Sequence, residues 1–208
     1  PAHAAYAEKG NNAIKAAFRL IAALEVLEEK WNAEKDRHPH HAHLAHPINF
    51  NIGNITGGEW PASVPAQCVF DLRAAIFADD DIKARSRELE DCIRQAAAGD
   101  PFMGNNPPQI AYHGFLAEGY ILENAEEPVA LLEACHKRVH GQELEGRAGT
   151  GTTDARFFGL YADIPGLVYG PLARDVHGFN ECVELDSVRR ITETIALFVA
   201  DWCGLDEL

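Results

Sequence analysis

The chain has 208 residues, of which 47% are hydrophobic, and carries a formal net charge of −14 at pH 7. That length and composition suffice for one folded domain or two smaller ones. The negative charge argues against binding to a nucleic-acid backbone or an anionic membrane, and no apolar run reaches the roughly 20 residues that a membrane helix requires.

The first predicted element is an amphipathic helix that starts after Asn12. Its apolar residues recur three or four positions apart and form one stripe: Ile14, Phe18, Ile21, Leu24, Leu27 and Trp31. Such spacing is typical of a helix that packs on a core by one face. A histidine-rich segment follows, with His38, His40, His41, His43 and His46. Its prolines and alanines give no ligand geometry, so we expect an exposed loop, with a metal-binding loop as the alternative.

Two strands are predicted next, over residues 47–57 and residues 64–77. In the second strand, apolar positions alternate with a set that contains Asp71 and Arg73. Because alternate residues of a strand point to opposite faces, one face of this strand is polar enough to line a site. Arg73 is therefore either an anchor for a carboxylate or an ion-pair partner of Asp71.

A second helix is predicted after the run of three aspartates that ends at Asp81, with Gly99 as its stop. Residues 100–108 are expected to form a loop, and residues 109–117 a short strand. Residues 1–117 thus read helix, strand, strand, helix, strand. This is the order of a ferredoxin-like βαββαβ unit without its first strand, and it predicts an α+β fold.

Residues 118–208 change to an α/β pattern. Helices are predicted over residues 128–140, in a short segment that ends at Tyr161, and from a cap at Asp186 to Gly204. Residues 166–170 read as a short buried strand between the last two helices. We therefore place a domain boundary after residue 117.

His177 is the first candidate for chemistry. It follows the predicted strand in a Gly-Pro-rich loop, and α/β folds place ligand-binding groups at the carboxyl ends of strands. Imidazole is a common zinc ligand, but a lone histidine in a turn is more often a hydrogen-bonded structural residue. Glu181, four residues further on, is either a second ligand or a structurally paired carboxylate.

The glycine-rich run at residues 149–157 is a second candidate. Its backbone N–H groups and the start of the following helix can cradle an anion, and Arg156 can bind a carboxylate through two hydrogen bonds. The run does not fit the G-x-x-x-x-G-K-[ST] phosphate loop, so an ordinary capped helix start is the alternative. Composition alone gives His3 no interpretation.

The cysteines bear on the cellular compartment. They are odd in number, widely spaced and without a C-x-x-C pair: Cys68, Cys92, Cys135, Cys182 and Cys203. This usage is typical of reduced thiols, so we expect a cytoplasmic protein without a signal peptide. The start at Pro1, without methionine, is expected of a trimmed or partial polypeptide.

Four motifs, in this order, resemble one known family. They are PAHAAY with GNNAI in residues 1–14, GGEWPASVP with FDLR in residues 57–73, GTTDARF in residues 151–157, and the run that ends in HGFNE at residues 177–181. Over nearly its whole length the chain is similar to the acetylornithine deacetylase, succinyl-diaminopimelate desuccinylase and aminoacylase metallopeptidase family. The first two motifs resemble the dimerisation (lid) domain, and the last two resemble the end of the catalytic domain.

The resemblance implies a metal-dependent amidohydrolase that cleaves an N-acyl bond of an amino-acid-like substrate with two zinc or cobalt ions. It implies that His177 is a metal ligand. It also implies that His3 is catalytic and stabilises the oxyanion across a homodimer interface formed by the lid domains. Arg73, Thr152 and Arg156 would bind the substrate.

The resemblance further implies that the remaining metal ligands and a glutamate base lie upstream, in the N-terminal half of the catalytic domain. A catalytic zinc takes about three protein ligands, so this chain alone is expected to be inactive. It would hold the lid domain at residues 1–117 and the C-terminal part of the catalytic domain at residues 118–208. Ala62 stands where many members have asparagine, which leaves the substrate class open. The alternative is a non-catalytic dimerisation or binding module.

Overall fold

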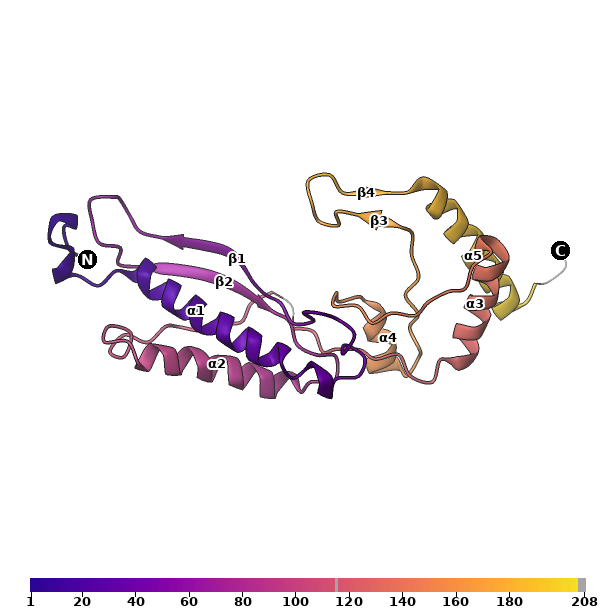
Figure 1. The fold of residues 1–208 in the computed structure, drawn as a ribbon, viewed down its shortest axis with the longest axis horizontal. Coiled ribbons are helices and arrows are strands. Elements are labelled where there is room, and N and C mark those ends of the chain that lie inside the picture. The colour runs from indigo at the N-terminus through magenta and orange to yellow at the C-terminus, as the bar shows by residue number, and fades with distance from the viewer. Residues whose placement is uncertain (115, 206–208) are drawn as a thin grey trace. The chain divides into compact units, whose positions relative to one another are not determined.

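The computed structural model describes residues 1–114 and 116–205. The chain divides into two compact units, Pro1–Gly119 and Tyr120–Leu208. The boundary expected from the sequence, after residue 117, falls beside this division. Helices and strands occur in both units (Figure 1), and the predicted mixed α and β class is confirmed. The finer ferredoxin-like arrangement stays a prediction.

The first unit is built from two long helices and a two-stranded sheet. Its elements are α1 (Ala13–Asn32), β1 (Phe50–Gly57), β2 (Cys68–Ala74) and α2 (Ile82–Ala98), with short 3-10 helices at Ala4–Lys9 and Lys35–Arg37. The strands pair antiparallel from Phe50 opposite Ala74 to Gly57 opposite Cys68, with a bulge between Ile52 and Asn54. The helix α1 packs on both strands and on α2, as Figure 1 shows.

The helix α1 begins where predicted, because the Asn12 side chain accepts a hydrogen bond from the backbone of Lys15 at 3.0 Å. Its buried face carries Ala16, Ala17, Leu20, Leu24, Leu27 and Trp31. The expectation that Phe18 belongs to this face was wrong, since its side chain is 58% exposed. At about 100° per residue, position 18 lies on nearly the opposite side of the helix from Leu20.

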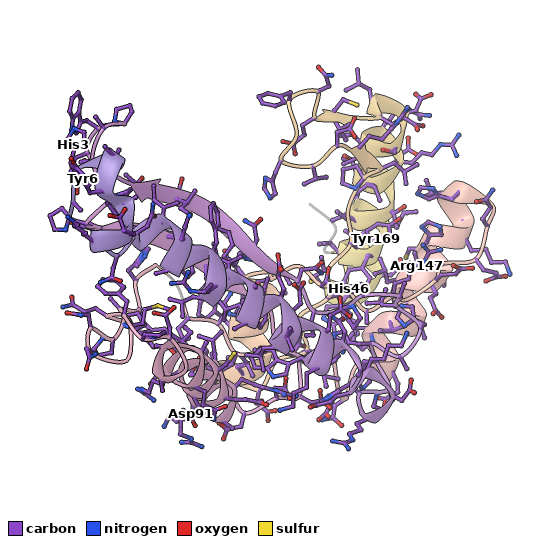
Figure 2. All side chains as sticks on the ribbon, turned by 60° about the vertical axis from the view of Figure 1, so that its left-hand side comes forward. His3, Tyr6, His46, Asp91, Arg147 and Tyr169 are labelled. Atoms are coloured by element: carbon purple, nitrogen blue, oxygen red, sulfur yellow. The ribbon has the colours of Figure 1, made fainter. Side chains whose placement is uncertain are left out.

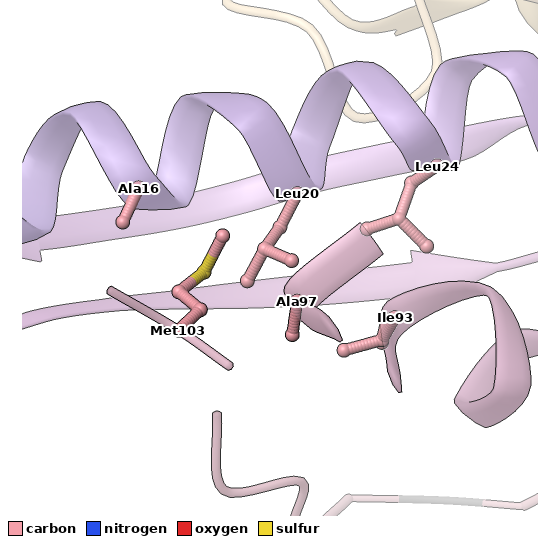
Figure 3. Packing of buried hydrophobic residues seen from close by; sticks show 6 residues of the cluster. All are labelled: Ala16, Leu20, Leu24, Ile93, Ala97 and Met103. Carbon is pink, nitrogen blue, oxygen red and sulfur yellow. The ribbon is translucent and has the colours of Figure 1, made fainter. Parts of the chain in front are cut away.

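The core of this unit lies between α1, α2 and the following loop. Figure 3 shows one cluster of buried residues: Ala16, Leu20, Leu24, Ile93, Ala97 and Met103. Phe70 and Leu72 of β2 pack against it, whereas Val69 and Arg73 on the alternate positions are exposed. The predicted alternation of β2 is therefore confirmed, and Arg73 lies on the face of the sheet that points away from the core.

The helix α2 also matches its prediction. The Asp81 carboxylate accepts a hydrogen bond from the Ala84 backbone at 2.7 Å, and Gly99 is the C-cap. The strand expected over residues 109–117 was wrong, since residues 109–114 and 116–117 form no strand. Side chains hold this segment instead: the Tyr112 hydroxyl donates to Glu90 at 3.2 Å, and His113 pairs with Asp71.

The second unit contains α3 (Glu126–His140), α4 (Ala155–Ala162), β3 (Ala173–Arg174), β4 (Cys182–Val183) and α5 (Leu185–Cys203). All three predicted helices are present, and α3 packs against α5. Leu132, Cys135 and Thr194 are buried in this unit, and burial raises the pKa of the Cys135 thiol. The expectation that Asp186 caps the last helix was wrong, because α5 starts at Leu185 and its N-cap is Glu184, two residues before Asp186.

The strand predicted at residues 166–170 is absent from the second unit as described. Gly166 donates its backbone N–H to the Tyr120 hydroxyl at 2.9 Å, so a side chain takes the place of a neighbouring strand. The only ladder of this unit among the described residues is the short antiparallel pair of β3 and β4. None of the helices described here combines the length and apolar character needed to cross a bilayer.

Candidate functional site

The N-terminal segment that carries His3 is fixed by backbone pairing with the loop between β1 and β2. The Ala4 N–H donates to the Ala62 carbonyl at 2.8 Å, and the Val64 N–H donates to the Ala2 carbonyl at 2.7 Å. His3 thereby sits opposite Ser63 in an isolated antiparallel bridge. These backbone hydrogen bonds bring the first resemblance motif, in residues 1–14, next to the second, in residues 57–73.

One nitrogen of the His3 imidazole forms a hydrogen bond within the chain. Its Nδ1 accepts a hydrogen bond from the Ala5 backbone at 3.1 Å, which leaves the proton of a neutral ring on Nε2. The side chain is exposed and lies near Tyr6, with ring centroids 6.3 Å apart (Figure 2). The Nε2–H group of His3 is thus a hydrogen-bond donor available to a ligand.

A pocket of about 490 Å³ lies beside this segment. It is lined by Ala4, Ala7, Asn12, Ile14, Gly57, Gly58, Glu59, Trp60, Pro61, Ser63, Val64 and Pro65. Two positions in its wall require glycine. Gly58 has a φ of +82°, which side chains of L-residues disfavour, and a Cβ on Gly57 would lie only 2.9 Å from the Cys68 sulfur. The described lining contains one carboxylate and no basic side chain.

Arg73 is the substrate-binding candidate of β2. Its neighbour Asp71 accepts hydrogen bonds from Asn54 at 3.1 Å and from His113 at 3.2 Å, so Asp71 is already engaged. In the part of the chain that is described, Arg73 forms no ion pair with it. The guanidinium group of Arg73 lies on the exposed face of the sheet.

Thr152 and Arg156 flank the start of α4 in the second unit. Thr152 is exposed, whereas Arg156 is buried against its own loop. Its Nη1 donates to the Thr153 carbonyl at 3.3 Å and lies 3.6 Å from the Asp154 carboxylate, and its guanidinium group covers the Phe157 ring. Arg156 therefore stabilises the turn that leads into α4, and its guanidinium is largely occupied.

His177, the metal candidate, lies in the turn that joins β3 to β4. Its backbone is left-handed, with a φ of 65°, and its side chain is exposed. The turn closes through the Gly178 N–H, which donates to the Asp175 carbonyl at 2.6 Å. No group of three or more histidine, cysteine, aspartate or glutamate side chains suited to a metal ion occurs among the described residues. His177 is thus a single potential ligand.

The histidine-rich segment is more ordered than the sequence suggests. His38 stacks on Phe77 with ring centroids 3.7 Å apart and contacts the Asp79 carboxylate at 2.6 Å. His41 is only 7% exposed, and burial lowers its pKa. The expectation of an exposed loop was wrong for His41, because Phe77 provides an apolar surface that the histidine composition does not reveal.

Comparisons with known proteins agree with these motifs. Residues 1–101 match the family model of the peptidase dimerisation domain. The chain is 26% identical over 215 residues to the N-formyl-4-amino-5-aminomethyl-2-methylpyrimidine deformylase of Halalkalibacterium halodurans, an alignment that covers 98% of this chain and 49% of the relative. It is 27% identical over 202 residues to the succinyl-diaminopimelate desuccinylase of Phenylobacterium zucineum, covering 95% of this chain and 48% of the relative.

A solved structure with a similar fold is that of an aminopeptidase, PepT, from Bacillus cereus. The TM-score is 0.62 at 18% identity, and the match covers 98% of this chain and 49% of the aminopeptidase. At this identity the likeness concerns the fold alone. The chain spans about half the length of the curated relatives it matches.

Proposed function

Residues 1–101 belong to the peptidase dimerisation domain family, and from this premise we propose that the chain forms part of a metal-dependent amidohydrolase. The family resemblance expected from the four sequence motifs is thereby confirmed. The relatives are hydrolases: one is a deformylase and another a desuccinylase. Their names support hydrolysis of an N-acyl amide bond on an amino-acid-like molecule as the reaction of the complete protein.

The dimerisation domain is the observation that carries this proposal. We assign it to the lid domain at residues 1–117, with a ferredoxin-like sheet that β1 and β2 begin. Ile55 and Val69 on these strands are exposed large apolar side chains, which suits a surface that a second copy covers. The lid would thus join two copies of the protein into a homodimer.

The exposed surface of the second unit supports a partial catalytic domain at residues 118–208. Its exposed apolar side chains include Phe158, Val168, Leu172, Phe179 and Leu185. Folded monomeric domains rarely leave so many large apolar groups in water. An N-terminal half of the catalytic domain would cover them and would supply a strand beside residues 166–170.

The residues that the structure describes do not fit a complete metal site. A catalytic zinc takes about three protein ligands, and His177 is one exposed imidazole. We therefore propose that the complete protein holds two zinc or cobalt ions and that this chain contributes one ligand. Metal ligands in the N-terminal half of the catalytic domain would complete the site.

The other roles follow from the geometry of each side chain. The Nε2–H group of His3 is suited to donate to the oxyanion of a tetrahedral intermediate, across the homodimer interface. The exposed guanidinium of Arg73 is suited to bind a carboxylate through two hydrogen bonds. Thr152 would add a hydroxyl, and Arg156 would hold the loop of Thr152 in place and lie close to the substrate. The five free cysteines suit the reducing cytoplasm.

Hydrolysis assays on two proteins test the proposal. We expect the protein made from the complete coding sequence to hydrolyse N-formyl or N-succinyl amines only with zinc or cobalt added, and the 208-residue chain to release no product. A complete protein that binds metal and dimerises but hydrolyses neither amine would favour a non-catalytic binding module. That alternative rests on the absence of a three-ligand cluster from the described residues.

A further inference from the structure

The side of α1 that points away from the core has an apolar centre between charged ends. Leu20 and Leu24 point towards the core (Figure 3). Phe18 and Val26 are instead 58% and 70% exposed, and the exposed Ala22 lies midway between them. At about 100° per residue, Ala22 lies about 160° around the helix from Leu24. We call this side the outer face of α1, and its residues are Lys15, Phe18, Arg19, Ala22, Glu25, Val26 and Glu29.

The order of side chains on the outer face is complementary to itself. A two-fold axis through Ala22 would place a second copy of α1 antiparallel to the first. Each residue then meets the one that lies equally far from Ala22 on its other side. This arrangement brings apolar groups together and joins each positive charge to a negative one: Phe18 with Val26, Arg19 with Glu25, and Lys15 with Glu29.

The charges of the outer face also oppose the macrodipole of α1. Lys15 lies in the first turn and Glu29 in the last turn, whereas the partial charges of a helix favour an acid at its start and a base at its end. An antiparallel partner removes this conflict, because Lys15 of each helix then lies beside Glu29 and the negative end of the other helix.

Lys15 and Glu29 are the charges of the outer face best placed to pair with a second copy. Arg19 already forms an ion pair with Asp100 at 2.6 Å. Glu29 contacts only His46 more loosely, at 3.6 Å, and its side chain is 76% exposed.

We propose that the outer face of α1 is a contact between two copies of this chain, with the helices antiparallel and Ala22 at the two-fold axis. This inference rests on the homodimer of the proposed function and names a surface that forms it. Ile55 and Val69 mark an apolar area on the sheet, but apolar side chains alone set no register. The charges at the two ends of α1 do set one, and the small Ala22 lets the helices approach closely.

Charge reversals test this contact in the protein made from the complete coding sequence. Sedimentation equilibrium measures the dissociation constant of the dimer. Lys15→Glu and Glu29→Lys each bring like charges together at two symmetric places, so each should raise this constant by at least about tenfold. An equimolar mixture of the two variants should recover an affinity within about threefold of the parent, because their heterodimer pairs opposite charges at both ends.

Controls separate this pairing from effects on folding and on net charge. Each reversal places a charge that suits its end of the macrodipole, so neither should weaken α1 itself. Lys83→Glu reverses an exposed charge in the first turn of α2 and should leave the dimer unchanged. Glu29→Lys makes the net charge of −14 less negative, so long-range repulsion between copies would predict a tighter dimer and not a weaker one.

Three outcomes would overturn the proposal. They are a monomeric parent, a dissociation constant that neither reversal changes, and a loss of dimers that mixing does not restore. Hydrolysis of an N-acyl amine is assayed with zinc in the same samples. A dimeric parent without hydrolysis would count against the proposed amidohydrolase, while the mixing result would still decide the contact through α1.

Discussion

The guanidinium group of Arg85 lies over the ring of Trp31, 4.8 Å from its centroid. The same group forms ion pairs with Asp80 at 2.9 Å and Glu34 at 2.8 Å, while the Trp31 N–H donates to Glu88 at 2.9 Å. Burial alone would lower the pKa of Arg85, but the hydrogen bonds that it donates to Asp80 and Glu34 raise it. This cluster ties the end of α1 to the start of α2.

Removal of the Arg85 charge should destabilise the first unit. Its side chain is 11% exposed, so Arg85→Met would leave the Asp80 carboxylate, which is 9% exposed, without its cationic partner, at a cost of about 3–5 kcal/mol in the free energy of unfolding. The matched change Arg94→Met affects a side chain that is 61% exposed, and its surface ion pairs are screened by water, so it should change the free energy of unfolding far less than Arg85→Met. Urea unfolding of both variants checks this. Equal losses would mean that the buried cluster contributes nothing.

The buried stripe of α1 gives a second prediction. Leu24 is almost fully buried, and Leu24→Ala should cost about 2–5 kcal/mol because it leaves a cavity between α1 and α2. Val26 is on the exposed side of the same helix, and Val26→Ala should change stability by less than about 0.5 kcal/mol. Denaturation midpoints compare the two, and the reverse order would show that α1 is packed by another face.

The stability of the first unit should depend on pH through His41. Burial lowers its pKa below the ordinary value of 6.5, an effect that His38, His40 and His43 add to and Asp79 opposes. Because the unfolded chain takes up the proton first, this contribution is complete above about pH 6.5 and falls as pH drops towards the folded pKa. Urea midpoints should therefore decrease from pH 7.5 to pH 5.

The variant His41→Leu provides the control for the pH effect. Leucine fills the apolar space beside Phe77 but cannot be protonated, so the decrease between pH 7.5 and pH 5 should be smaller in the variant. A pH dependence identical to that of the parent would exclude His41 as its source.

The role of His3 gives a kinetic prediction for the complete protein. If its Nε2–H donates to the oxyanion, His3→Ala should reduce kcat by about 10²–10³-fold and leave KM nearly unchanged. His40→Ala removes another exposed histidine and should have the parent's kcat. Steady-state assays with an N-acyl substrate measure both. A His3→Ala enzyme with an unaltered kcat would rule out the proposed role.

The sequence predicted the elements whose local signals are strong. Helices α1 and α2 carry side-chain caps at Asn12 and Asp81, and α3 ends at Gly141 in a left-handed conformation, so their ends were predictable. The two strands that were predicted wrongly, at residues 109–117 and 166–170, are apolar segments with no neighbouring strand among the described residues. Strand formation depends on such partners, which a local pattern does not contain.

The arrangement of the candidate site residues was not predictable from the sequence. The bridge between His3 and Ser63 joins segments 60 positions apart in sequence, and no local pattern indicates such pairing. The burial of His41 beside Phe77 escaped the sequence analysis for the same reason.

The dependence of hydrolysis on His177 tests the central claim most directly. Amide hydrolysis by the protein from the complete coding sequence would be measured with zinc added, for the parent and for His177→Ala. We expect the rate of the variant to fall by at least about 10²-fold, with one zinc fewer bound per subunit. A variant that retains the full rate and the full zinc content would contradict the proposal that this chain supplies a ligand to the catalytic metal site.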